Sequence, residues 1–322
     1  DVIFNDPFLV KDIRTGSDNS FPSRLTAVGN TLFFRANDGV NGTELWKSDG
    51  TADGTVLVKD IRTGSDNSSP DLLTVVGNTL FFRANDGVNG SELWKSDGTA
   101  DGTVLVKDIR TGSDSSSPDR LTVVGNTLFF RANDGVNGTE LWKSDGTEQG
   151  TVLVKNISTG SSNSNPDRLT VVGNTLFFQA DDGVNGRELW KSDGTADGTV
   201  LVKGIRTGSG GSVPRYLTVV GNTLFFTADD GVNGYELWKS DGTEQGTVLV
   251  KDIRSGSDSS VPRYLTVVGN TLFFRANDGV NGNELWKSDG TADGTVLVKD
   301  IYPGSNLSLI HISEPTRLRR IS

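Results

Sequence analysis

One stretch of sequence is written six times in this chain, and this repetition limits the possible folds more than any other feature. Each copy reads close to LTVVGNTLFFRANDGVNGxELWKSDGTxxxGTVLVKDIRTGS and continues into a Ser- or Asn-rich link with a proline. The copies run from residue 25 to about residue 306 with a constant period of 48 residues. Units of this size bury their apolar side chains by stacking on their neighbours. One tryptophan marks each copy: Trp46, Trp94, Trp142, Trp190, Trp238 and Trp286.

Each copy predicts four short antiparallel strands and no helix. The first two strands are joined by Gly77-Asn78 in the second copy, a pair that tolerates the positive φ angles of a tight hairpin turn. No segment shows a helical period of useful length. The chain is therefore predicted to be all β. The expected strands of the second copy are residues 73–76, 79–84, 91–96 and 103–109.

Two apolar runs in every copy indicate how the strands are arranged. The runs LFF and VLV place apolar side chains at consecutive positions, so both faces of each sheet require burial. Four strands in about 40–50 residues are typical of the blades of a β-propeller. We predict a β-propeller of six complete blades, with an open stack of the same sheets as the alternative. Residues 8–14 match only the fourth strand of a copy and leave one spare strand, so six or seven blades are expected.

The pattern divides the chain into three parts. Residues 1–24 contain the last strand of a blade and its link, and residues 25–306 contain the six repeats of the propeller. Residues 307–322 depart from the pattern. Their opening, LSLIHISEPTR (Leu307–Arg317), resembles the in-frame translation of a sequencing-library adapter, so we expect a non-native tail there.

Composition excludes several function classes. The 322 residues include no cysteine and a single histidine, His311, which lies in the expected tail. Disulfides, thiolate chemistry and cysteine-bound zinc are therefore excluded, and the repeats contain no histidine for a catalytic triad. The formal net charge of -10 argues against a nucleic-acid partner, because such partners require clustered positive charge. No apolar run approaches the ~18 residues of a membrane-spanning helix, so no membrane insertion is expected.

The motif ELWKSDGT, followed by GTVLVKDI and a Gly-Ser pair, carries a family resemblance. The motif recurs in register in all six copies and resembles the ELWxxDGT repeat family of large secreted bacterial proteins. The resemblance implies a propeller-like extracellular module. It implies neither an enzymatic activity nor a defined ligand.

The repeated carboxylates allow two interpretations. Asp86 and Glu92 lie within one loop of the second copy, and oxygen ligands so close together suit calcium, although the spacing differs from that of an EF-hand. Asp and Asn also hold tight loops without a metal, by accepting hydrogen bonds from their own backbone. Catalysis by a carboxylate pair needs two different environments, and six equivalent copies offer none. We expect no enzyme and no cofactor, with calcium as the alternative.

Three positions vary from copy to copy and are the expected places of any binding specificity. They precede ELW, precede LTVV and follow the Phe pair. Neutral drift of exposed residues after duplication is the alternative interpretation. The tryptophans are expected to pack between blades, with sugar stacking as their alternative role. The candidate binding residues at the variable positions are Tyr216, Tyr235, Tyr264, Arg187, Arg35, Arg83, Arg131 and Arg275.

These observations lead to two hypotheses of function. The first is a non-enzymatic extracellular structural or interaction module, for adhesion or assembly, with a protein or glycan partner at the cell surface. Its spare strand predicts homo-polymerisation by β-augmentation, since an unpaired strand is a template for another chain. The second is a multivalent carbohydrate-binding, lectin-like propeller with one weak site in each blade.

Overall fold

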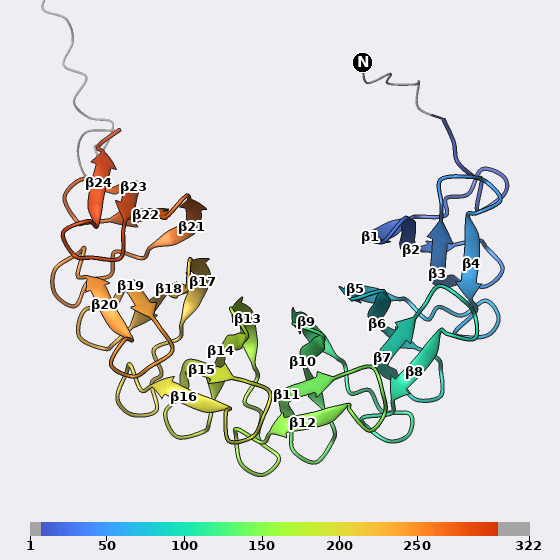
Figure 1. Cartoon of the computed structure of the whole chain (residues 1–322), viewed down its shortest axis with the longest axis horizontal. Coiled ribbons are helices and arrows are strands. Elements are labelled where there is room, and N and C mark those ends of the chain that lie inside the picture. The colour runs from blue at the N-terminus through green and yellow to red at the C-terminus, as the bar shows by residue number, and fades with distance from the viewer. Residues whose placement is uncertain (1–7, 302–322) are drawn as a thin grey trace, which may run out of the picture. The chain divides into compact units, whose positions relative to one another are not determined.

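The structure is a computed structural model that describes residues 8–301, and every regular element in that range is a β-strand. The strands form six antiparallel sheets of four consecutive strands each (Figure 1). Within this range no helix is long and apolar enough to cross a membrane. The prediction of an all-β fold made of four-stranded, propeller-type blades is confirmed. The expected tail, residues 307–322, lies outside the described residues.

The chain divides into two compact units, which are considered separately. Among the described residues, the first comprises 8–204 and 208–211, and the second comprises 205–207 and 212–301. The sheets of the first unit are β1 (Ser23–Val28), β2 (Thr31–Asn37), β3 (Thr43–Ser48) and β4 (Val56–Lys59); β5 (Asp71–Val76), β6 (Thr79–Asn85), β7 (Ser91–Ser96) and β8 (Val104–Lys107); β9 (Asp119–Val124), β10 (Thr127–Asn133), β11 (Thr139–Ser144) and β12 (Val152–Lys155); β13 (Asp167–Val172), β14 (Thr175–Asp181), β15 (Arg187–Ser192) and β16 (Val200–Lys203). The sheets of the second unit are β17 (Arg215–Val220), β18 (Thr223–Asp229), β19 (Tyr235–Ser240) and β20 (Val248–Lys251); β21 (Arg263–Val268), β22 (Thr271–Asn277), β23 (Asn283–Ser288) and β24 (Val296–Lys299).

The turns predicted from glycine pairs set the register of each sheet. In the second sheet, Val76 pairs with Thr79 across the two-residue turn, where Gly77 has a φ of 59°. The β6 and β7 strands then pair without interruption, which places Phe82 opposite Trp94. The register shifts between Asp71 and Thr74 in the first strand. The register also shifts between Leu93 and Trp94 in the pairing of β7 with β8, so only the pairing of the two central strands is regular.

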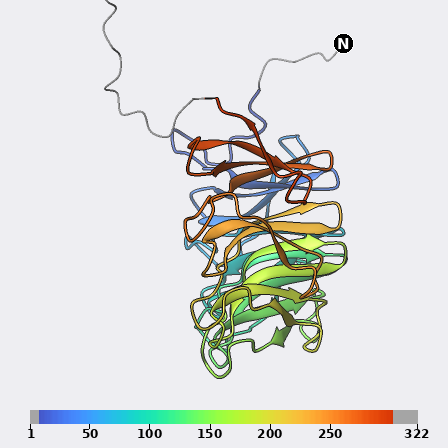
Figure 2. The ribbon, with the colours of Figure 1, turned by 90° about the vertical axis from the view of Figure 1, so that its left-hand side faces the viewer.

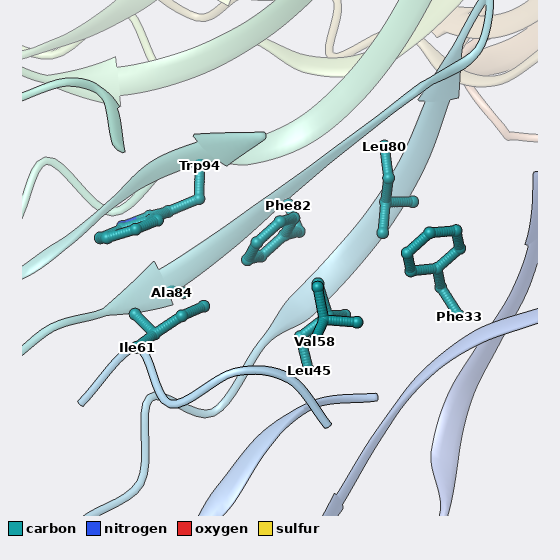
Figure 3. Close-up of a cluster of buried hydrophobic side chains, with 8 residues drawn as sticks. All are labelled: Phe33, Leu45, Val58, Ile61, Leu80, Phe82, Ala84 and Trp94. Atoms are coloured by element: carbon teal, nitrogen blue, oxygen red, sulfur yellow. The ribbon is translucent and has the colours of Figure 1, made fainter. Parts of the chain in front are cut away.

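The core lies between neighbouring sheets of each unit, which stack as layers (Figure 2). Alternate residues of a strand point to opposite faces, so Phe82 of β6 faces the preceding sheet and Phe81 faces the following one. Figure 3 shows one such cluster, in which the second sheet packs against Phe33, Leu45, Val58 and Ile61 of the first. The second sheet contributes Leu80, Phe82, Ala84 and Trp94.

The expected spare strand, residues 8–14, lies against the first sheet but is not a strand. No described residue forms a third strand beside it with which it could pair. Its Lys11 Nζ nevertheless donates to the Thr55 carbonyl oxygen at 2.7 Å, as Lys59 Nζ donates to Thr103 O at 2.8 Å between complete sheets. Residues 8–14 thus take the place that a preceding fourth strand would have.

The glycine of the SDGT turn allows this close stacking, and we predict that its substitution tests the stacking directly. Gly98 has a φ of 92°, and a Cβ there would lie 3.1 Å from Phe33 Cζ of the preceding sheet. The equivalent Gly50 has a φ of 94° with nothing within 4 Å. Gly50→Ala should lose about 1–2 kcal/mol of unfolding free energy, the cost of a left-handed non-glycine residue. Gly98→Ala should lose about 1 kcal/mol more from overpacking. Urea unfolding of the two variants measures the difference, and equal losses would contradict face-to-face stacking at this turn.

Candidate functional site

A buried glutamate in the third strand of the first, second, third and fifth sheets holds the link that leads to the next sheet. In the second sheet, Glu92 is fully buried, and its Oε1 accepts the Ser116 backbone N–H at 2.7 Å. Its Oε2 accepts the Ile109 N–H at 3.3 Å and the Ser116 hydroxyl. Glu44 makes the same set of contacts with the link after the first sheet. Both carboxylate oxygens therefore bind the chain itself.

Burial dominates the electrostatics of these glutamates. Loss of solvent raises the pKa of Glu92 from 4.5 to about 7, although the hydrogen bonds from Ser116 and Ile109 lower it. Glu44 and Glu236 have their pKa raised to about 7 for the same reason. The sequence analysis did not identify this clamp. The available signal was a serine 24 residues after each ELW glutamate, for example Ser116 after Glu92.

Of the two carboxylates weighed as calcium ligands, Glu92 belongs to the clamp and Asp86 accepts hydrogen bonds from its own loop, as Asp97 does in the following turn. Asp86 Oδ1 accepts the Val88 and Asn89 N–H groups at 2.9 and 2.7 Å. Burial raises the pKa of Asp86, but these hydrogen bonds outweigh it and the net pKa is lowered. Asp97 Oδ1 accepts both the N–H and the hydroxyl of Thr99, which lowers the pKa of Asp97. These contacts support the loop-holding interpretation. No group of three or more acidic, histidine or cysteine residues gathers among residues 8–301, and calcium stays a prediction.

All six tryptophans have little accessible surface, and four of them lie between layers of one unit: Trp94, Trp142, Trp190 and Trp286. Trp94 is 6% exposed and lies in the cluster between the first two sheets, at the end where Figure 3 shows Ala84 and Ile61. The indole Nε1 atoms of all six are buried and have no hydrogen-bond partner within the described range. A ring buried on this scale offers no face on which a sugar could stack.

The variable position before LTVV occupies a strained backbone. This residue has a φ of 56–58° in every sheet, within the left-handed region that non-glycine residues rarely adopt. It sits in the irregular part of the first strand, where the register shift turns its side chain out of the ladder. Tyr216 and Tyr264 are 37% and 69% exposed there. The residues at this position are Arg24, Leu72, Arg120, Arg168, Tyr216 and Tyr264.

In the first unit, the arginines that follow the Phe pair have polar partners on the first strand. Arg35 Nε donates to the Ser23 hydroxyl at 3.0 Å. Arg131 lies 2.8 Å from the Asp119 carboxylate. Arg83 reaches the Asp71 carboxylate at 3.4 Å, and Arg24 of the preceding sheet reaches that same carboxylate at 2.7 Å. The side chains of these three candidate binding residues, Arg35, Arg83 and Arg131, are therefore already bonded to partners within the protein. Arg187, also a candidate, is exposed at the start of β15.

In the second unit, the first-strand aspartate is replaced by arginine. Arg215 and Arg263 stand where Asp71 stands in the second sheet. The Arg215 guanidinium lies 5.0 Å from the ring centroid of Tyr235, and that of Arg275 lies 5.3 Å from the ring centroid of Tyr264. The structure thus brings the predicted Tyr264 and Arg275 together.

Arg215 and Arg263 were missed by the sequence analysis. The signal that could have found them is the residue after the link proline, which changes from Asp in the second, third and fourth copies to Arg in the last two.

The chain's similarity to known proteins is found among solved structures. No known family and no curated protein matches its sequence. Among solved structures, it is similar to the computationally designed Ika8 protein, with 16% identity over 88% of this chain and 75% of that one, and a TM-score of 0.45. It is also similar to a prolyl endopeptidase at 13% identity and a TM-score of 0.49. Oligopeptidase B from Leishmania major is 12% identical, also with a TM-score of 0.49. Both peptidase alignments include 87% of this chain. They include 43% of the prolyl endopeptidase chain and 41% of the oligopeptidase B chain, so this chain spans less than half the length of either peptidase.

We predict that the glutamate clamp makes stability depend on pH. The pKa of Glu92 is about 7 in the folded chain and 4.5 as the ordinary value, so the folded state holds this proton more tightly than the unfolded state. The group's contribution to stability is therefore complete below about pH 4.5 and is lost as the pH rises to about 7. Glu92→Gln should cost about 1–3 kcal/mol at pH 5, because one buried N–H loses its acceptor. The difference in unfolding free energy between the variant and the wild type should become smaller towards pH 8.

Urea unfolding at several pH values between 5 and 8 measures this effect. Glu148→Gln is the control, because Glu148 is exposed in the turn between β11 and β12 and should leave the profile unchanged. A gap that widens towards pH 8 would show that the ionised clamp is the more stable form.

Proposed function

We propose that this protein is a non-enzymatic extracellular structural module that assembles with copies of itself through the faces of its blades. The observation that carries the proposal is a face of the last sheet that no residue among 8–301 covers. Leu285, Val298 and Ile301 are 40%, 43% and 68% exposed. Their counterparts in the preceding sheet, such as Leu237 and Val250, are buried under the β21–β24 sheet.

The first sheet of a second copy fits this face residue by residue. The buried counterparts receive Leu272, Phe274, Ala276 and Trp286 of the next sheet. The sheet β1–β4 offers the same four residue types on its outward face: Leu32, Phe34, Ala36 and Trp46. Residues 8–14 now lie over part of that face.

Residues 8–14 also supply a strand for the proposed contact. They form no strand within their own chain, and β24 is the outer strand of its sheet. In the assembly, we propose that residues 8–14 leave their own first sheet and pair with the β24 edge of the neighbouring copy. This route gives a structural form to the hypothesis, made from the sequence, that the spare strand polymerises the protein by β-augmentation.

Two features support the non-enzymatic part of the proposal. The oxygens of the buried glutamates accept hydrogen bonds from the chain, so they are not presented to a substrate. The aspartates of the loops are likewise engaged with their own backbone. The extracellular location is supported by the resemblance of the ELWKSDGT motif to secreted repeat proteins.

Assembly is tested with charges placed on the uncovered face. The wild-type chain should grow in mass with concentration in sedimentation experiments, and Leu285→Asp with Val298→Asp should remain monomeric, because assembly would bury both carboxylates. Val280→Asp is the control, since Val280 is 70% exposed but lies in a loop away from this face. A wild-type chain that stays monomeric at all concentrations would reject the proposal.

A second candidate function, a carbohydrate-binding propeller, is favoured by the exposed tyrosines beside arginines in the second unit. Tyr264 and Tyr235 each lie against a guanidinium, and Tyr264 remains 69% exposed. Exposed aromatic rings flanked by polar groups suit the faces of sugars. A glycan array with the full chain should show binding that is lost by at least tenfold in Tyr216→Ala with Tyr235→Ala. An array without any binding to the wild-type chain would contradict this candidate.

A further inference from the structure

Two arginines face each other in the last sheet without a counter-charge. Arg263 of β21 and Arg275 of β22 are direct partners in the antiparallel register. Like charges directly opposite each other on a sheet are destabilising. The Nε atoms of both side chains are buried and lack a hydrogen-bond partner. No carboxylate pairs with either arginine among residues 8–301.

In each of the other five sheets, the cross-strand pair at this position contains at most one arginine. The register pair is Asp71 with Arg83 in the second sheet and Asp119 with Arg131 in the third, and both are ion pairs. The remaining sheets place at most one charged residue of the pair opposite a neutral one: Ser23 with Arg35, Asp167 with Gln179 and Arg215 with Thr227. The last sheet alone among the six presents two cations at this position. The Arg263–Arg275 pair therefore lacks the negative charge that would balance it.

Three carboxylates of the second unit, those of Asp229, Asp258 and Glu236, have partners other than the arginine pair. Asp229 accepts a hydrogen bond from Arg206 at 2.6 Å, and Asp258 pairs with Arg254 at 3.0 Å. Glu236 holds the link through Ser260. The charge of the arginine pair is therefore available to a ligand.

An exposed aromatic ring adjoins the pair. Tyr264 directly follows Arg263, and its ring lies 5.3 Å from the Arg275 guanidinium. Its left-handed backbone, with a φ of 58°, turns the side chain out of the strand ladder. The site therefore offers two guanidinium groups for an oxyanion and, beside them, an apolar face for a ring.

We propose that Arg263, Arg275 and Tyr264 bind a carboxylate-bearing saccharide, such as a uronic acid unit. Guanidinium groups recognise carboxylates through paired, charge-assisted hydrogen bonds. The tyrosine face accommodates the C–H face of the sugar ring to which the carboxylate is attached. Inorganic phosphate shares the anionic chemistry but has no ring to place on Tyr264. This inference rests on the carbohydrate-binding candidate above and names its ligand class and its position.

Calorimetry with the full chain tests the site, using trigalacturonate, its methyl ester and inorganic phosphate as probes. The wild-type chain should bind trigalacturonate, with affinity that falls as salt is added, and should bind the uncharged ester at least tenfold more weakly. Arg263→Asp should abolish the binding, because it builds the Asp–Arg pair that the second and third sheets contain. This variant should fold, since those sheets carry the same pair in the same register.

Two further variants separate the site from the rest of the surface. Arg275→Gln places in β22 the residue that Gln179 provides in β14, and it should weaken trigalacturonate binding by at least tenfold. Arg83→Gln is the matched control in the first unit and should leave binding unchanged, because Arg83 is paired with Asp71. Binding that survives in Arg263→Asp would overturn the proposed position.

The outcomes also distinguish this inference from the broader candidate. Phosphate binding as tight as that of trigalacturonate would overturn the saccharide assignment in favour of a simple oxyanion site. No binding of either anion, together with neutral glycans captured through Tyr216 and Tyr235, would overturn this inference and leave the carbohydrate-binding candidate standing. No binding of any probe or glycan would overturn both.

Discussion

A sheet whose two faces are both apolar cannot be stable alone, and every other feature of this protein follows from that constraint. Phe81 and Phe82 are neighbours in the chain and point into different cores. Each sheet therefore needs a layer on either side, and the identical sequence of the next repeat supplies a layer of matching shape. The glycine of the SDGT turn lets the layers approach, since Gly98 leaves room for the ring of Phe33. Because the repeats have nearly the same sequence, equivalent residues form the interface between each pair of neighbouring sheets within a unit.

The buried glutamates determine how one layer is connected to the next. A link without regular structure leaves N–H groups unpaired, and burying such groups costs free energy. Glu92 accepts the N–H groups of Ile109 and Ser116, and so it satisfies two of them at once. Where the same link leads into the next first strand, Ser117 and Arg120 have strained backbones, with φ values of 51° and 57°. Packing and clamp together hold the first strand in a conformation that it would not adopt by itself.

That rigid frame permits variation on the first strand. Leu72, Arg120 and Tyr216 share one backbone conformation, although their side chains have little in common. The residue beside them changes from aspartate to arginine along the chain, which converts an internal ion pair into a pair of unbalanced cations. A scaffold stabilised by its layers tolerates such a change, because the core residues are unaffected. The side chains that differ in chemistry among these repeats therefore lie at positions that the core does not constrain.

The sequence by itself determined the class of fold, the four strands of each repeat and the hairpin turn at Gly77-Asn78, because these depend on local periodicity and turn chemistry. It also identified Tyr264 and Arg275 as candidates, because they vary among otherwise equal copies. Only the tertiary structure decided which arginines have a partner. Arg131 and Arg275 are the same residue type at the same place in the repeat, yet one lies opposite Asp119 and the other opposite Arg263. The partner is set by the cross-strand register, and a register shift within the first strand cannot be read from composition or spacing. The link clamp was hidden for the same reason: Glu92 and Ser116 are 24 residues apart in the chain and meet only when the sheet and its link have folded.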